Sequence, residues 1–442
     1  MQKPTFKEAL KFWTKLGFIS FGGSAGQIAI MHEYLVDKKK WISESKFLHA
    51  LNYCMILPGP EAQQLATYIG WLLHGVRGGL AAGILFVLPS VFILLALSTI
   101  YVSYGTIPVV YSVFNGLKPA VIAIIILALI KIGSKSLLSP FHYFVAVAAF
   151  VSLYFLHISF PVVLIGAALL AVITRKIFPG VFTASAKNET QKQDNEEEYC
   201  INKNSIAPAT GFSALRFLKI SGVTLLLWIS PLAAFYFLSN DFLFWKKLSL
   251  FFTQAALITF GGAYAVLPYV AQVSVEKLHW LSNLQMIDGL ALGETTPGPL
   301  IMVLAFVGFM AGYNNFGGSL AISTLGLVTT TFYTFLPSFF FIFTGAPIIE
   351  STQENKNLKE IFSVITAAVV GVVLNLSIYL GKAVLFPVTV SLAGLDYLSL
   401  LWIVASLLAM YRFKINMIAW IGASALFGLA RYIIEIYFLK AS

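Results

Sequence analysis

The chain carries little charge for its size. Only 11% of its 442 residues are Asp, Glu, Lys or Arg, whereas soluble globular domains carry about 25%. Hydrophobic residues make up 58% of the chain. So few charges cannot cover the surface of soluble domains, which excludes a soluble nucleotide-binding enzyme. Because so apolar a chain is not disordered either, the composition indicates an integral membrane protein.

Cysteine and histidine are also scarce. The two cysteines are Cys54, in an apolar stretch, and Cys200, in a polar one, so the sequence predicts neither a disulfide framework nor a metal-thiolate site. The six histidines include no His-Glu-x-x-His pair. An intramembrane metalloenzyme would need histidines and carboxylates that converge. We therefore expect no enzyme, no metal and no cofactor.

The few charges are unevenly balanced. Lys and Arg number 29 against 19 Asp and Glu, a formal net charge of +10. In a membrane protein such an excess is typical of loops that face anionic lipid, so we expect a lipid bilayer as partner and no nucleic acid. Lysine recurs every four residues from Lys3 to Lys15, a spacing that predicts an amphipathic helix at the membrane interface and argues against a cleaved signal peptide.

Long apolar segments follow in both halves. A spanning helix needs about 20 mostly apolar residues, and candidate segments are Gly79 to Tyr101, Leu117 to Ile132, Phe141 to Leu156, Pro161 to Ile173, Val223 to Leu238, Ser319 to Phe343, Ile361 to Leu380, Tyr397 to Tyr411 and Ile415 to Tyr437. Lys176 to Ser213 is polar and of mixed charge, which is typical of a solvated linker.

The chain contains an internal repeat. Phe21-Gly22-Gly23 recurs as Phe260-Gly261-Gly262, and Pro58-Gly59-Pro60 recurs as Pro297-Gly298-Pro299, both 239 positions later. Leu88-Pro89-Ser90 returns 248 positions later as Leu336-Pro337-Ser338. A duplicated membrane unit is the simplest explanation. The predicted organisation is a first repeat at 1–175, a polar linker at 176–213, a connecting transmembrane helix at 214–240 and a second repeat at 241–442.

The repeats set the expected fold. Each copy holds about six hydrophobic segments, and an even number per copy plus one connecting helix places the copies in opposite orientations. The sequence thus predicts an all-α integral membrane protein, a polytopic helical bundle of two homologous, inverted repeats with helices broken at Pro-Gly-Pro. It leaves the oligomeric state open, with a homodimer as one option.

The Pro-Gly-Pro triplets are the first candidate site. Proline removes a backbone donor and disfavours helix in the residue before it, so each triplet breaks a helix inside the membrane. Protein or a polar cavity must then satisfy the freed backbone groups. A half-helix that begins after the break favours an anion at its amino-terminal end. The candidate substrate-binding residues are Phe21, Gly22, Gly23, Pro58, Gly59, Pro60, Gln63, Gln64, Phe260, Gly261, Gly262, Thr295, Thr296, Pro297, Gly298 and Pro299.

Each feature of this site also has a structural explanation. Gly and Pro kinks in membrane helices are often packing devices, and Gln and Thr beside them often cap broken helices. Glu61 and Glu294 are candidates for proton coupling, because an ionisable group inside a membrane is costly; alternatively, Glu61 stabilises a helix dipole. Lys118, Lys131, Lys382 and Arg431 are expected to extend to the interface, although one of them could neutralise a doubly charged substrate.

These residues resemble a known family. The segments from Phe21-Gly22-Gly23-Ser24 to Pro58-Gly59-Pro60-Glu61-Ala62-Gln63-Gln64, and from Phe260-Gly261-Gly262-Ala263-Tyr264 to Glu294-Thr295-Thr296-Pro297-Gly298-Pro299, are similar to the two signatures of the chromate ion transporter family in its long, two-domain form. One departure is Ser24, where many relatives carry proline. The resemblance implies chromate efflux across a bacterial cytoplasmic (inner) membrane by a multi-pass secondary transporter, driven by membrane potential or a proton gradient, and chromate resistance.

Other functions stay open at this point. Sulfate has the same tetrahedral shape and double charge as chromate, so a carrier of sulfate or another oxyanion is the nearest alternative. An anion channel and an intramembrane metalloenzyme fit less well. If the carrier hypothesis holds, we expect Gly59 and Gly298 to lie at one shared cavity and not on opposite outer faces.

Overall fold

A computed structural model describes the chain at residues 3–21, 23–177, 198–202, 205, 211–260, 262–349, 356–387 and 389–439. Two of the candidate site residues, Gly22 and Gly261, lie outside the described residues, as does most of the 176–213 linker. Within the described ranges the chain is almost entirely helical, with one isolated bridge between Ile42 and Ile201. The prediction of an all-α protein is confirmed.

The first repeat is a series of seven helices with one short π-helical turn. They are α1 (Phe6–Ile19), α2 (Gly23–His32), η1 (Glu33–Lys38), α3 (Glu44–Ile56), α4 (Glu61–Tyr104), α5 (Pro108–Ser136), α6 (Pro140–Tyr154) and α7 (Phe160–Ile177). Inside α4, His74 and Gly75 leave the helical conformation, and Gly75 has φ +63°. The chain reverses there, because Gly70 and Gly78 on the two sides are in direct contact.

The second repeat presents the same series in the same order. After α8 (Ala214–Leu238) come α9 (Phe242–Leu257), α10 (Ala263–Gln272), η4 (Val273–Lys277), α11 (Asn283–Thr295), η5 (Leu300–Met302), α12 (Val303–Asn315), α13 (Leu320–Ile349), α14 (Lys356–Leu385), η6 (Leu392–Gly394), α15 (Tyr397–Leu407), η7 (Leu408–Arg412), α16 (Met417–Ile434) and η8 (Glu435–Leu439). Here a loop with Gly317 and Gly318, both at positive φ, replaces the reversal inside α4. The helix α8 falls within 214–240, while the predicted domain boundaries stay predictions.

The matching sequence signals produce matching helix starts. Ser43 caps α3 by accepting from the N–H of Lys46, and Ser282, 239 positions later, caps α11 by accepting from the N–H of Gln285. A side-chain oxygen at this position satisfies an amide that has no partner within the helix. The repeated serines therefore start the helices that lead into the two Pro-Gly-Pro triplets.

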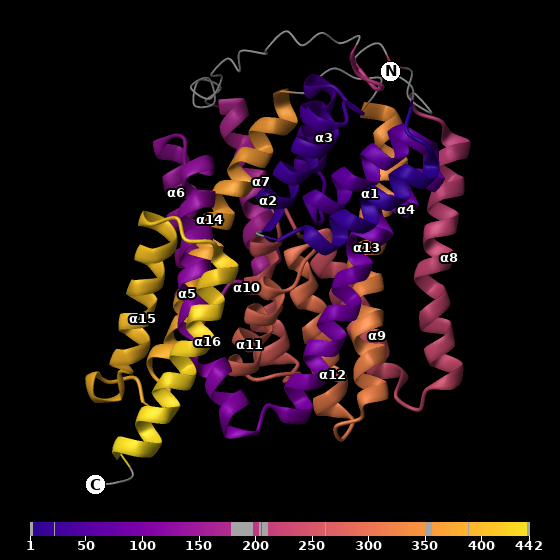
Figure 1. Cartoon of the computed structure of the whole chain (residues 1–442). Coiled ribbons are helices and arrows are strands. Elements are labelled where there is room, and N and C mark those ends of the chain that lie inside the picture. Colours follow the sequence, from indigo (N-terminus) through magenta and orange to yellow (C-terminus); the bar gives the residue numbers. More distant parts are fainter. Residues whose placement is uncertain are drawn as a thin grey trace.

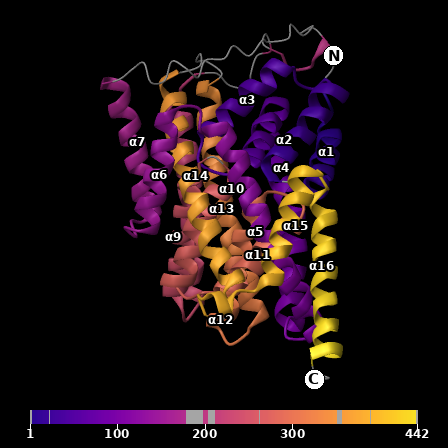
Figure 2. The same ribbon diagram turned by 90° about the vertical axis from the view of Figure 1, so that its left-hand side faces the viewer.

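The two repeats are inverted relative to each other. In Figure 1, α3 lies at the end of the molecule where the N-terminus is marked, whereas α11 and α12 lie toward the opposite end, and α8 runs along the side between them. The view turned by 90° also places α3 and α12 at opposite ends (Figure 2). One crossing helix between two like units thus gives the opposite orientations that the sequence predicts.

The outer surface suits a lipid environment. Among the described residues, seven helices are long and apolar enough to cross a membrane: α4, α5, α7, α8, α13, α14 and α16. The helix α8 is the extreme case, because Leu215, Phe237 and Leu238 on it are 79%, 80% and 86% exposed. Apolar side chains exposed in this way belong against lipid tails. The protein is therefore a multi-pass membrane protein.

Candidate functional site

The two Pro-Gly-Pro breaks are paired across the repeats. The N–H of Gly59 donates to the carbonyl of Thr259 at 2.8 Å, and the N–H of Gly298 donates to the carbonyl of Ser20 at 2.7 Å. Thr259 and Ser20 each directly precede a Phe-Gly-Gly motif. Each break is therefore closed by the residue that precedes the Phe-Gly-Gly of the other repeat, and both of these contacts lie at the repeat interface. The backbone groups freed by proline find protein partners there, as a membrane interior requires.

Glycine is required at both breaks. Gly59 has φ +125° and Gly298 has φ +104°, a region that L side chains rarely adopt. A Cβ at Gly59 would lie 2.5 Å from Ser338 Oγ, and a Cβ at Gly298 would overlap Ser90. Ser90 also donates to the carbonyl of Pro297 at 2.5 Å. The repeated Leu-Pro-Ser motifs thus bring their serines against the Pro-Gly-Pro of the other repeat.

Polar atoms without a hydrogen bond gather around the breaks. Gln27 donates to the carbonyl of Gly298 at 2.5 Å, and Gln64 donates to the carbonyl of Pro58 at 2.8 Å. Within the part of the chain that the structure describes, Oε1 of both glutamines and the hydroxyls of Ser20 and Ser338 have no hydrogen-bond partner although they are buried. Buried polar atoms in native proteins are normally satisfied, so this region has capacity for water or a polar ligand.

A cavity of about 710 Å³ lies beside the breaks, with walls from both repeats. The first repeat contributes Gly23, Ser24, Gln27, Pro60, Glu61 and Ala62, and the second contributes Gly262, Tyr264, Glu294, Pro299, Leu300 and Ile301. The cavity therefore contains the first residues after each Pro-Gly-Pro, where helical N–H groups have no acceptor within the helix. It sits at the place where the sequence predicts an anion.

Both candidate carboxylates line this cavity. Glu294 is 5% exposed and accepts a hydrogen bond of 2.5 Å from the hydroxyl of Tyr264. Glu61 stands beside Gly262, since a Cβ on that glycine would lie 3.9 Å from Glu61 Oε1 and 3.8 Å from Ser24 Oγ. The two acids come from different repeats and occupy positions that do not correspond under the repeat. Both nonetheless line the same cavity.

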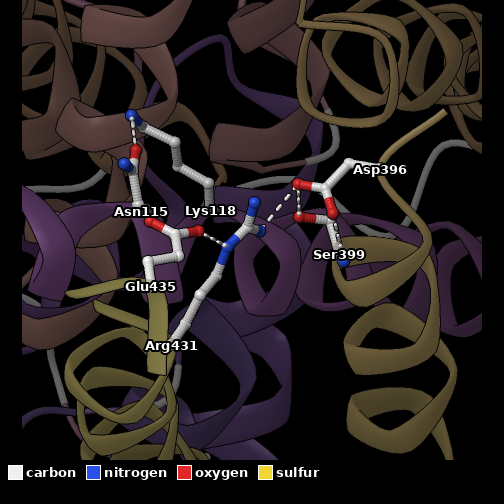
Figure 3. Close-up of polar contacts among 6 residues, drawn as sticks. All are labelled: Asn115, Lys118, Asp396, Ser399, Arg431 and Glu435. Carbon is white, nitrogen blue, oxygen red and sulfur yellow. Dashed lines mark hydrogen bonds and ion pairs between the residues drawn. The ribbon is translucent and has the colours of Figure 1, made fainter. Parts of the chain in front are cut away.

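The structure also distinguishes among the cations. Lys131 and Lys135, one turn apart on α5, line the cavity. Lys382 instead donates to the hydroxyl of Tyr154 at 2.6 Å. Figure 3 shows the guanidinium of Arg431 between two carboxylates, with Asp396 at 2.7 Å and Glu435 at 3.0 Å.

Lys118 does not extend to the interface. The expectation for this residue was wrong, because its side chain is only 7% exposed and lies 3.6 Å from a carboxylate oxygen of Asp288. Its ammonium group donates to Asn115 Oδ1 at 2.8 Å, a contact also drawn in Figure 3. The carboxylate of Asp288, on another helix, provides the partner that a buried charge requires.

The other predicted site residues surround the cavity without lining it. Gln63 donates to the hydroxyl of Thr67, and Thr295 and Thr296 both donate to the carbonyl of Leu292, at 2.8 and 2.7 Å. Those threonine contacts are the capping alternative considered above. Phe21 and Phe260 are half-buried; Phe260 packs on the ring of Phe362. Pro58, Gly59, Pro297 and Gly298 form the breaks themselves.

Sequence reasoning missed several residues of the site. Ser20 and Thr259 act through their carbonyl groups, which any residue could supply, so no side-chain signal marks them. Ser90 and Ser338 were visible as a repeated motif, but only the fold places them against the breaks. Lys135 could have been found from periodicity alone, since it follows Lys131 by one helical turn, whereas Tyr264 meets Glu294 only because the fold packs α10 beside α11.

Comparisons with known proteins identify the family of the chain. The profile of the chromate transporter family matches residues 7–172 and 246–429. The chain belongs to the chromate transporter family. A chromate transport protein of Cupriavidus metallidurans is 26% identical over 97% of this chain and 94% of its own length. A probable chromate transport protein of Synechococcus elongatus is 25% identical, with 90% of each chain covered.

Another chromate transport protein, from Pseudomonas aeruginosa, is 29% identical over 81% of this chain and 77% of that relative. No solved structure matches the chain significantly. The resemblance inferred from the sequence is thus confirmed at the level of the family, over both repeats.

Proposed function

We propose that the protein is a secondary active transporter that exports chromate across the bacterial cytoplasmic membrane and so confers chromate resistance. The observation that carries the proposal is the shared cavity, to which each repeat contributes the start of a half-helix and one carboxylate. The names of the relatives support chromate as the substrate.

The binding groups are backbone amides and lysines. Glu61 and Ala62 begin α4, Leu300 and Ile301 begin the matching segment, and all four line the cavity. Helix starts offer free N–H groups and a partial positive charge, both of which favour a doubly charged oxyanion. A tetrahedral anion has oxygens on several sides, so two half-helix starts from opposite directions can bind it together.

The charges in the cavity suggest how binding is coupled to protons. Lys131 and Lys135 bring two positive charges, and Glu61 and Glu294 bring two negative charges when ionised. The ionised cavity is therefore neutral and repels an anion at the carboxylates. When both acids are protonated, the two lysines balance a dianion. Protonation of Glu61 and Glu294 thus favours loading.

The membrane potential supplies the direction. Moving one charge across 100 mV is worth about 2.3 kcal/mol. A dianion leaving a cell that is negative inside therefore gains up to about 4.6 kcal/mol per 100 mV when no proton leaves with it, and each proton that does leave with it cancels about 2.3 kcal/mol of that gain. Inverted repeats offer two equivalent arrangements around one central site, which is the basis of alternating access. We propose that the repeats rock about the paired breaks and expose the cavity to each side in turn.

The test is labelled chromate flux in proteoliposomes, with and without an imposed pH gradient and with excess sulfate as competitor. We expect chromate flux that depends on the gradient and falls at least about tenfold in Glu294→Gln, since glutamine keeps this position in the neutral form that favours loading and cannot ionise to release the anion. The matched control is Glu435→Gln, a glutamate that pairs with Arg431 away from the cavity.

Each outcome has a clear reading. Sulfate movement without chromate movement in a folded preparation would keep the carrier and discard the substrate. Currents far above carrier turnover would replace the carrier with a channel. If the flux does not depend on the pH gradient and Glu294→Gln leaves it unchanged, the proposal that Glu294 couples transport to protons is wrong.

A further inference from the structure

A second charged cluster lies in the repeat interface, away from the cavity. It consists of Lys118 on α5, Asp288 on α11 and Tyr101 on α4. The hydroxyl of Tyr101 donates to Asp288 Oδ2 at 2.9 Å, and the ammonium group of Lys118 lies 3.6 Å from Asp288 Oδ1. The lysine and aspartate side chains are 7% and 6% exposed. This buried ion pair therefore connects α5 of the first repeat with α11 of the second.

The cluster is closed by aromatic rings, and its ion pair is longer than a hydrogen bond. The ring of Tyr101 packs on Phe114 at 5.0 Å and on Phe306 at 5.5 Å. Lys118 donates a hydrogen bond to Asn115 (Figure 3). Among the described residues, Asp288 Oδ1 has no hydrogen-bond partner. The ion pair is therefore a contact that can open without breaking a short hydrogen bond.

The cluster and the cavity lie toward opposite ends of α5. The lining residues on and after this helix run from Ile124 to Leu138, at and beyond its carboxyl-terminal half. Lys118 lies six residues before Ile124, in the amino-terminal half. The lining residues Lys135 and Leu138 are exposed, which places the open end of the cavity beside them, whereas Lys118 is buried beyond the other end.

The repeat explains why one end is open. The position that corresponds to Lys118, 248 positions later, is Thr366, and Thr366 lines the open cavity. The position that corresponds to Asp288 is His49. Because the repeats are inverted, corresponding positions lie at opposite ends of the carrier. Lys118 of the first repeat lies at the closed end, and Thr366 of the second repeat lies at the open end. Thr366 carries no charge, so a lysine–aspartate pair cannot form at the corresponding positions of the other end.

One helix connects the ion pair to the cavity. Asp288 and Glu294 both belong to α11, six residues or about 9 Å apart along the helix. A displacement of α11 when a ligand binds beside Glu294 would therefore pull Asp288 away from Lys118. Gly289 allows the ring of Phe306 to pack directly on α11, since a Cβ there would clash with that ring.

We propose that Lys118, Asp288 and Tyr101 form the gate that closes the far side of the carrier, the side where α12 ends, while the cavity is open to the near side, where α3 begins. This inference rests on the proposed carrier function. The buried ion pair must separate before the anion can leave on the far side.

The test measures access to the space between gate and cavity. Ala291 lies one helical turn from both Asp288 and Glu294 on α11 and is 1% exposed. In a background with Cys54→Ala and Cys200→Ser, Ala291→Cys is reacted with a membrane-impermeant thiol reagent in vesicles of both orientations. Lys39→Cys marks the near side and Asn315→Cys marks the far side, because both residues are exposed.

With the gate intact, we expect Ala291→Cys to react faster from the near side. Adding Lys118→Met should raise the far-side rate at least about tenfold, because an unpaired buried carboxylate destabilises the closed state. The exchange Lys118→Asp with Asp288→Lys should restore the slow rate. Lys382→Met is the matched control and should leave the rate unchanged, since Lys382 bonds to Tyr154.

The outcomes separate the gate from the transport function. An unchanged far-side rate in folded Lys118→Met, with a normal elution profile and Tm, would overturn the gate even if chromate flux is observed. A raised rate that the charge exchange does not reverse would also overturn it, because loosened packing alone would explain the result. Reversible opening in a protein that moves no chromate would keep the gate and reject the proposed substrate.

Discussion

The two repeats have the same backbone design but different charges. Each has a Phe-Gly-Gly segment, a Pro-Gly-Pro break and a Leu-Pro-Ser motif, and each break is closed by the other repeat in the same way. The ionisable groups do not follow this symmetry: Glu61 corresponds to Leu300, and Glu294 corresponds to Met55. The repeated part therefore fixes geometry, whereas the unrepeated part gives the two ends of the carrier different chemistry.

The largest effect is expected where the symmetry is strictest, at the glycines of the two breaks. Gly59→Ala and Gly298→Ala each place a Cβ at positive φ and against a buried serine. Strain of about 1–2 kcal/mol plus an overlap of about 1–3 kcal/mol should lower Tm in detergent and abolish flux. Thermal unfolding of purified variants measures the loss.

The order of the two variants sharpens the comparison. Gly298→Ala should be the worse variant, because its Cβ would overlap Ser90 more closely than a Cβ at Gly59 approaches Ser338. Adding Ser90→Ala to Gly298→Ala should recover part of the lost Tm. Alanine tolerated at both glycines would mean that the breaks are not held in this geometry.

Much of this backbone design could be predicted from the sequence, because it depends on Gly and Pro, whose restrictions are local. The breaks and the duplication follow from the positions of these residues, and the inversion was predicted from an even number of hydrophobic segments per copy plus one connecting helix. The pairing of Gly59 with Thr259 could not be predicted, since it depends on how two units separated by 200 residues dock. Lys118 was misjudged for the same reason: a lysine in an apolar run extends to the interface unless another helix supplies a carboxylate, and Asp288 does so here.

A smaller effect should separate the two serines of the Leu-Pro-Ser motifs. Ser90 donates to the carbonyl of Pro297, while the hydroxyl of Ser338 has no hydrogen-bond partner among the described residues. Ser90→Ala should therefore cost about 1 kcal/mol of stability, and Ser338→Ala should cost less or nothing. Paired Tm measurements decide it. If Ser338→Ala is the more damaging, a ligand or water on that hydroxyl would have to hold the first break.

The smallest effect concerns a surface ion pair found in one repeat. Lys38 contacts Glu33 at 2.7 Å with both side chains exposed, whereas Gln272 occupies the corresponding position beside Lys277. The ammonium group of Lys38 lowers the pKa of Glu33 from its usual 4.5. The pair therefore stabilises the fold above that value and stops doing so as the pH falls through the lowered pKa.

Because the pair is solvated, salt should screen it. Glu33→Gln should leave Tm unchanged at neutral pH in high salt and remove only a slight decrease of Tm on acidification in low salt. A large Tm loss in high salt would show that the loop between η1 and α3 depends on this charge, and that the repeats differ in how they hold the helix leading into each break. Because both Glu33 and Lys38 are exposed, we expect no such loss. This difference in surface charge between the repeats has little influence on the fold, in contrast to the unrepeated carboxylates Glu61 and Glu294 that line the cavity.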